Sequence, residues 1–175
     1  MLMDPSIYSI RKSFLLPLGL IVLLSSILLI TALVLQLPKA KAIILGIFLL
    51  PALVLFAESS LRRVRVTKQG IEVSKLLRNK QMAYADLTAI DTIQVRKRAF
   101  ISLSSEKDFI ILSNSYAQFG ELLRQLVELA PETAVSDETR QLASNPPQKC
   151  SDVFSAWLAV VVLVLIIMAQ FNNVF

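Results

Sequence analysis

The chain contains no histidine, a single cysteine and only four glycines. Without histidine it lacks the commonest general base and the commonest metal ligand, so histidine-based nucleophile triads and zinc sites are excluded. The one cysteine, Cys150, excludes an intramolecular disulfide. Because the four glycines stand far apart, a glycine-rich phosphate loop is also excluded. Charged residues make up 18% of the chain and hydrophobic residues 55%, which is typical of neither disordered nor ordinary soluble proteins.

The hydrophobic residues gather in three runs that predict membrane-spanning helices. Residues 14–37 contain no charge and are long enough, at about 1.5 Å per residue, to cross a hydrocarbon core of about 30 Å. The second run, 42–57, is short for a span, so Lys41 and Glu58 are expected at the two interfaces. The third run is 153–171. Together the first two runs predict an N-terminal transmembrane hairpin, preceded by a short tail within residues 1–57.

The first run has an alternative interpretation as a secretory signal. Arg11 and Lys12 precede it, and the residues at 40–42 resemble a small-residue cleavage site. A signal core of about 7–15 residues is much shorter than this run, which favours a membrane helix.

Basic residues near the helix ends predict the orientation in the membrane. Several follow the second run, whereas the tail after the third run has none. Lys39 and Lys41 favour the opposite orientation. We expect a multi-pass integral membrane protein with its N-terminus and central segment in the cytoplasm and its C-terminus on the opposite side.

The central segment, 58–131, shows the pattern of a small β domain closed by a helix. Apolar and polar residues alternate in short stretches, which indicates half-buried strands. Six strands are expected in an antiparallel meander, near 61–67, 70–77, 80–85, 88–96, 98–104 and 108–113. Apolar residues then recur at helical spacing and predict a capping helix over 115–130. Residues 132–152 are expected to form a linker, with one or two helical turns at 136–143.

Two stretches, VRVTKQGIEVSKLLRNKQMAYADLTAI and FIILSNSYAQFGELLRQLVEL, resemble bacterial pleckstrin-homology-like (PH-like) domains of small membrane proteins. The matching features are Thr67, Gly70, Ile71, Tyr84, Asp86 and Leu87. The resemblance implies a split β-barrel, usually of seven strands, capped by a C-terminal helix; six strands would be a departure. The expected fold class is therefore an α+β membrane protein with a small antiparallel PH-like barrel between the transmembrane hairpin and a third transmembrane helix.

Positive charge is concentrated in the first part of this domain. Residues 61–98 contain ten Lys or Arg and three Asp or Glu, whereas residues 106–138 contain two and seven. If the strands run up and down, alternate turns return to the end that follows the second membrane helix. We therefore predict a surface facing anionic lipid headgroups, made of Arg62, Arg63, Arg65, Arg78, Lys80, Arg96, Lys97 and Arg98. The alternative is that these residues only follow the positive-inside bias and keep the turns soluble.

Few residues suggest catalysis, modification or the binding of a specific ligand. Asp86 and Asp91 are interpreted as turn and solvated acids rather than as a catalytic pair. Cys150 is interpreted as an unmodified thiol, with lipidation as the alternative. A phosphoinositide pocket is disfavoured because the first turn offers only Lys68. Interleaved aromatic residues for stacking bases are missing, which argues against nucleic-acid binding.

These observations predict no catalytic residues, no cofactor and no metal. We expect a non-enzymatic, membrane-anchored adaptor or assembly factor that meets anionic headgroups of the lipid bilayer and binds a protein partner. The alternative is a constitutive small subunit of a larger integral membrane complex.

Overall fold

The computed structural model describes residues 5–147 and 151–172, which divide into two compact units. Residues 5–11 and 61–147 belong to a β unit, and residues 12–60 and 151–172 belong to a helical unit. The β unit is therefore discontinuous in sequence, because the first two long helices are inserted between its first and second strands.

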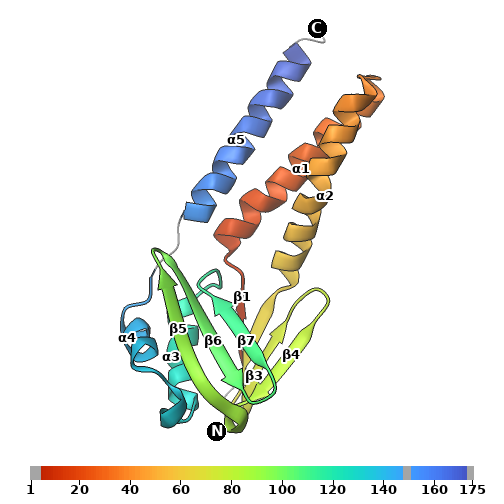
Figure 1. Cartoon of the computed structure of the whole chain (residues 1–175). Coiled ribbons are helices and arrows are strands. Elements are labelled where there is room, and N and C mark those ends of the chain that lie inside the picture. Colours follow the sequence, from red (N-terminus) through yellow and green to blue (C-terminus); the bar gives the residue numbers. More distant parts are fainter. Residues whose placement is uncertain (1–4, 148–150, 173–175) are drawn as a thin grey trace. The chain divides into compact units, whose positions relative to one another are not determined.

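Two antiparallel sheets form the body of the β unit (Figure 1). The first has the order β1-β2-β3-β4, with β1 at Ser6–Ser9, β2 at Arg63–Val66, β3 at Gly70–Ser74 and β4 at Asn79–Ala83. The second has the order β5-β6-β7, with β5 at Leu87–Val95, β6 at Arg98–Ser105 and β7 at Phe109–Ser113. A short 3-10 helix, η1 (Tyr84–Asp86), joins the two sheets. Within each sheet consecutive strands pair antiparallel, as the sequence predicts, but the expected meander is divided into two sheets between β4 and β5.

The described residues contain seven strands rather than the expected six. The additional strand is β1, in the tail before the first membrane helix, where Tyr8 and Ile10 are buried. It pairs with β2, so that Ser6 lies opposite Val66 and Ser9 opposite Arg63. A strand of four residues gives a weak alternation signal, and its partner follows two long helices, so no local hairpin pattern points to it.

The closing helix, α3, runs over Phe119–Leu129 and begins later than expected. Residues 115–117 do not join it, because they bond to the end of β1. Arg11 N donates to Ser115 O (3.3 Å), and Ala117 N donates to Ser9 O (2.8 Å). One face of α3 is buried, through Phe119, Leu122, Leu123 and Leu126. These side chains join the fully buried residues of both sheets to form the core, including Val64, Ile71, Ile101, Leu103 and Leu112.

The segment expected to be a linker, 132–152, is structured in its first half. It contains the 3-10 helix η2 (Glu132–Ala134) and the helix α4 (Asp137–Ser144), which covers the helical turns expected at 136–143. Val135 forms a bridge with Ile90 of β5 and is buried. Polar composition suggested a solvated chain, but apolar residues at Ala134, Val135, Leu142 and Ala143 are spaced to face the sheet. Residues 148–150, which include Cys150, lie outside the described residues.

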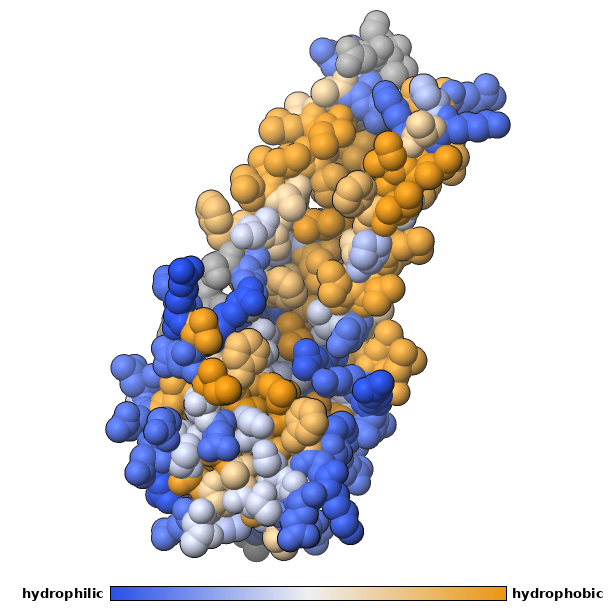
Figure 2. Space-filling model, viewed as in Figure 1, coloured by the Kyte–Doolittle hydropathy of each residue, from blue (hydrophilic) through white to orange (hydrophobic). Residues whose placement is uncertain are grey.

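The helical unit consists of α1 (Lys12–Val34), α2 (Lys39–Leu61) and α5 (Ser151–Asn172). All three are long and apolar enough to cross a membrane, as the sequence predicts. Figure 2 shows apolar side chains over most of the visible surface of these helices. The expected span 42–57 proves to be the centre of the longer helix α2, whose polar first and last turns continue the helix beyond the apolar run. Inside the unit, α1 packs against α5.

Candidate functional site: a basic end and an apolar sheet face

The chain leaves the β unit after β1 and re-enters it before β2 at one end of the first sheet, where Ser9 pairs with Arg63. Tyr116, which is fully buried, holds both crossing points. Its carbonyl oxygen accepts a hydrogen bond from Arg11 Nε (3.3 Å), and its ring lies 5.7 Å from the Arg62 guanidinium carbon. Such a cation–π contact contributes about 0.5–1 kcal/mol.

The third crossing, toward α5, lies at the same end. The buried Asn114 side chain donates through Nδ2 to the carbonyl oxygens of Lys97 (2.8 Å) and Pro147 (3.3 Å). Arg11 and Pro147 also line one cleft of about 360 Å³. Gly120 at the start of α3 permits this route, because a Cβ there would lie 2.6 Å from Pro146 Cγ. We call this region, marked by Arg11, Arg62 and Pro147, the tether end.

Two hairpin turns also lie at the tether end. Arg63 at the start of β2 pairs with Ser74 at the end of β3, so the β3–β4 turn, residues 75–78, is there. The β5–β6 turn at Arg96 and Lys97 is held there by Asn114. The β2–β3 turn and η1 lie at the opposite end, where Tyr84 N donates to Gln69 O (3.1 Å). The alternation of turns expected from the meander is confirmed within the β unit.

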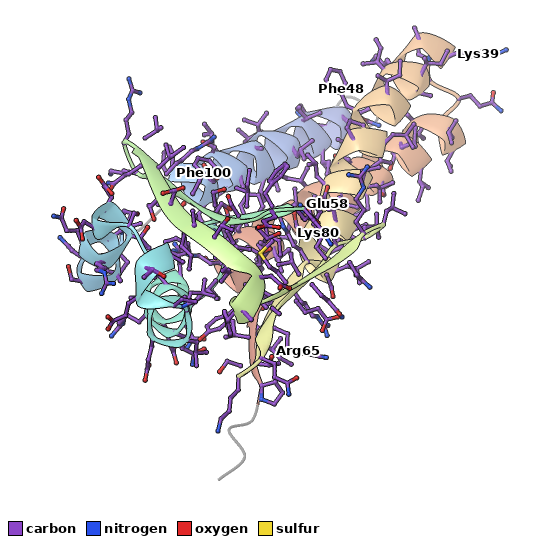
Figure 3. The ribbon with its side chains drawn as sticks, turned by 60° about the horizontal axis from the view of Figure 1, so that its bottom comes forward. Lys39, Phe48, Glu58, Arg65, Lys80 and Phe100 are labelled. Carbon is purple, nitrogen blue, oxygen red and sulfur yellow. The ribbon has the colours of Figure 1, made fainter. Side chains whose placement is uncertain are left out.

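The eight basic residues predicted to face lipid have three kinds of surroundings. Arg62 is half-buried against Tyr116. Arg65 and Lys80, labelled in Figure 3, each lie beside an acid. Arg65 Nη1 is 3.5 Å from Glu72 Oε2 on the neighbouring strand, and Lys80 Nζ is 2.5 Å from Asp108 Oδ1. These two positive charges are therefore partly offset by acidic neighbours.

The other five basic residues are exposed and lie at the tether end: Arg63, Arg78, Arg96, Lys97 and Arg98. Arg96 has a φ of 56°, in the left-handed region that side chains with a Cβ seldom adopt. The structure thus brings together five of the eight predicted residues from three separate stretches of sequence. The prediction that they face lipid headgroups stays a prediction.

Lys80, on β4 of the first sheet, contacts the second sheet at the start of β7. Besides Asp108, it donates to the carbonyl oxygen of Phe109 (3.0 Å) and lies 5.0 Å from the centroid of its ring. The hydrogen bond from Lys80, together with that from the Phe109 N–H, lowers the pKa of Asp108. A cleft of about 480 Å³ lies beside this contact, lined in part by Asp86 and Glu106.

The two aspartates considered for chemistry do not form a pair on one element. Asp86 ends η1 and Asp91 lies on β5, and both are exposed. Within residues 5–147 and 151–172, no group of three or more Cys, Asp or Glu residues is placed to hold a metal ion.

The motif residues of the PH-like resemblance build the end opposite the tethers. Thr67 Oγ1 accepts from Gly70 N (3.2 Å) and donates to Gly70 O (2.9 Å), which closes the β2–β3 turn. Tyr84 is buried behind this turn, and burial raises its pKa to about 12. These residues therefore determine the local structure of this end of the β unit.

Sequence reasoning missed an apolar patch on the outer face of the second sheet. We call it the apolar stripe; its members are Ile93, Phe100, Phe109 and Ile111. Ile93 is 62% exposed, Phe109 58% and Ile111 47%. Ile93 lies directly opposite Phe100, and Ile111 is diagonal to Phe100 on the next strand, so their side chains are neighbours.

Figure 2 shows apolar side chains gathered over this sheet, among hydrophilic surroundings. The signal in the sequence is the unbroken apolar run 109–112, since a strand with one solvated face normally alternates. An apolar sheet face bordered by polar residues is typical of a surface that interacts with a protein or a membrane.

Comparisons of the chain with protein-family models, with curated proteins and with solved structures find no match. The tether end and the apolar stripe are therefore the features of the described residues that point to a function.

Proposed function

We propose that the protein is a non-enzymatic adaptor or assembly factor, anchored in the membrane by three helices, whose β unit binds a partner protein through the apolar stripe. The observation that carries the proposal is the exposure of Ile93, Phe109 and Ile111 on one sheet face. Burying one such side chain contributes about 1.5–3 kcal/mol, so a partner covering the stripe gains substantial binding free energy.

The assignment of the β unit as a PH-like domain is supported by its topology. Four strands, then three strands, then a helix follow one another along the chain, in two antiparallel sheets. The strand β1 brings the number to seven, the number that the resemblance implies. PH-like folds serve many functions, so the fold alone does not identify the partner.

The pairing of β1 with β2 supports the expected membrane topology. Residues before α1 and after α2 belong to one sheet, so they must lie on the same side of a membrane that both helices cross. Residues leading to α5 are bonded to the same unit through Asn114, so α5 would start on that side and end on the other. The excess of basic residues supports a cytoplasmic position for that side, by the positive-inside rule.

The interpretation of the first run as a cleaved signal is disfavoured by the same pairing. Cleavage near residue 41 would remove β1, so that β2 would lose this partner and become an edge strand of the first sheet. It would also remove Tyr8 and Ile10 from the core.

Anionic lipid headgroups are the second proposed contact of the β unit. The five exposed basic residues lie at the end where the chain continues into the membrane helices. Each is worth about 1 kcal/mol near an anionic surface. Because the helices already anchor the protein, these charges would set the tilt of the β unit.

Co-purification from native membranes in mild detergent tests the adaptor proposal. We expect one reproducible partner with the parent chain and its loss in the double variant Ile93→Ser, Ile111→Ser. The matched control is Ile7→Ser, which removes a side chain that is 54% exposed on β1, outside the stripe. The same partner on parent and double variant alike would contradict the proposal.

The alternative is a constitutive subunit held through its helices, for which the exposed apolar side chains along α2 and α5 offer a contact surface. Phe48 and Phe154 are each 72% exposed. If Phe48→Ala and Phe154→Ala release the partner while the stripe variant retains it, the subunit interpretation replaces the adaptor. Deletion of 61–131 would not separate the two, because β1 and α4 would lose the sheets on which they pack.

A further inference from the structure

The tip of the β3–β4 hairpin carries two exposed leucines. Leu76 is 41% exposed and Leu77 is 90% exposed. The turn is closed by a hydrogen bond from Lys75 N to Arg78 O (2.8 Å). Residues at turn tips are normally Gly, Asn, Asp, Pro or Ser, which adopt the backbone angles of a turn or hydrogen-bond to its backbone groups, and which tolerate exposure to water. Leucine offers neither advantage, so the geometry of the turn does not explain this pair.

Basic residues border the leucines on both sides. Lys75 precedes them and Arg78 follows, and Arg78 is exposed. An apolar tip between basic flanks matches the interface of an anionic bilayer, where leucine enters the acyl boundary and the cations remain among the headgroups. Protein interfaces favour aromatic residues and arginine at their centre, and leucine is under-represented among hot spots. The composition of the tip therefore favours lipid over protein.

The tip lies at the tether end. Ser74, the last residue of β3, pairs with Arg63, the first residue of β2. A single residue, Arg62, separates β2 from the end of α2. One residue of extended chain spans about 3.5 Å, so the start of β2 cannot lie far from the membrane surface if α2 crosses it. Within the β unit, residues 75–78 continue past the Ser74–Arg63 pair at the end where the chain enters β2.

We propose that Leu76 and Leu77 insert into the interfacial region of the same bilayer that the helices cross, with Lys75 and Arg78 against anionic headgroups. The hairpin is then a further anchor, made by the β unit itself, which fixes how that unit faces the membrane. This inference rests on the membrane anchoring proposed above but not on a protein partner.

Depth-dependent fluorescence quenching tests the insertion. The full chain carries Cys150→Ser, which removes its only cysteine, and Leu77→Cys labelled with an environment-sensitive dye. It is reconstituted in vesicles of phosphatidylcholine and phosphatidylglycerol in equal parts. The control label is at Lys107→Cys, in the exposed β6–β7 turn at the other end of β6. Folding of both labelled chains is checked by circular dichroism.

We expect the label at position 77 to be quenched several-fold more by a nitroxide on the lipid acyl chain than the label at 107. Aqueous iodide should show the reverse order. Equal iodide quenching at the two positions would overturn the proposal. Protection of position 77 from both quenchers would also overturn it, since this result indicates cover by a second copy or another protein.

Charge reversal gives a second readout in the same vesicles. In the Leu77→Cys chain with Lys75→Glu and Arg78→Glu, lipid quenching at position 77 should fall to near the value at 107. Lipid quenching that is unchanged by this reversal would overturn the role assigned to the basic flanks. The vesicles contain no partner protein, so a failed co-purification would not affect the test of the leucine tip. A failed quenching test would likewise not affect the proposal that the apolar stripe binds a partner.

Discussion

At the β2–β3 turn, Gly70 lies so close to β4 that a side chain does not fit. A Cβ at this position would meet Met82 O at 2.3 Å and Ala83 Cα at 2.9 Å. Both are backbone atoms, so the strands themselves would have to separate. Two residues of the PH-like resemblance thus have a physical role: Thr67 closes the turn and Gly70 permits the strand pairing.

Gly70→Ala should therefore lower the free energy of unfolding by about 2–4 kcal/mol, because overpacking against backbone cannot relax cheaply. Thermal or denaturant unfolding in mild detergent, followed by circular dichroism, measures this. Gly46→Ala is the control, since nothing lies within 4 Å of a Cβ there. A Gly70→Ala chain as stable as the control would show that this strand pairing is looser than described.

Tyr84, which is buried behind the same turn, gives a pH-dependent prediction. Its hydroxyl is buried and has no hydrogen-bond partner among the described residues, and burial raises its pKa from 10.0 to about 12. The unfolded chain therefore ionises first. The stability from this group is present below pH 10 and is lost as the pH rises toward 12.

Tyr84→Phe should remove most of this loss between pH 10 and 12. At neutral pH the variant should be as stable as the parent or more stable by about 1 kcal/mol, because an unsatisfied buried hydroxyl is removed. The free energy of unfolding of both chains, measured across this pH range, tests the prediction. Parallel curves would mean that Tyr84 ionises with its ordinary pKa.

Among the elements, α4 shows how a polar segment becomes part of a fold. Thr139 is fully buried, and its hydroxyl donates to Ile90 O (3.1 Å). It also lies 2.8 Å from Thr92 Oγ1 and 2.8 Å from Ser136 Oγ. Ser136 N donates to the same carbonyl oxygen (3.2 Å). This network attaches α4 to the edge of β5, which would otherwise be open.

Thr139→Val keeps the shape of the side chain but removes its hydrogen bonds. We expect the free energy of unfolding to fall by about 1–3 kcal/mol, because the buried partners lose a donor or acceptor. Amide hydrogen exchange at Ser136 and in β5 should become faster. Thr133→Val, at an exposed position in η2, is the matched control and should change neither quantity. Slow exchange at Ser136 in both variants would contradict this account of α4.

The sequence predicts elements whose signal is local and misses those whose partner is distant. Alternation in 61–113 predicts β2 to β7 within a few residues, and helical spacing predicts α3. The strand β1 and the docking of α4 depend on Val66 and Ile90, which lie far away in sequence. The position of the five basic residues at the tether end was predictable, because alternate turns of an up-and-down meander lie at the same end. The ion pairs of Arg65 and Lys80 were not, because they depend on side chains from other strands.

At the scale of the whole molecule, the discontinuous β unit is the feature on which the other proposals depend. If α1 and α2 cross a membrane, as proposed, their insertion between β1 and β2 requires them to cross it as a hairpin. The relation to the membrane proposed for the tether end, the five exposed cations and the leucine tip depends on this arrangement.

Cysteine accessibility in sealed vesicles tests it most directly. In the Cys150→Ser chain, single cysteines replace Ile7 on β1, Lys107 in the β6–β7 turn, and Gln36 between α1 and α2, all exposed positions. A membrane-impermeant maleimide should label positions 7 and 107 from the same side and position 36 only from the other. Labelling of positions 7 and 107 from opposite sides would contradict the account, because β1 and β2 could not then belong to one sheet.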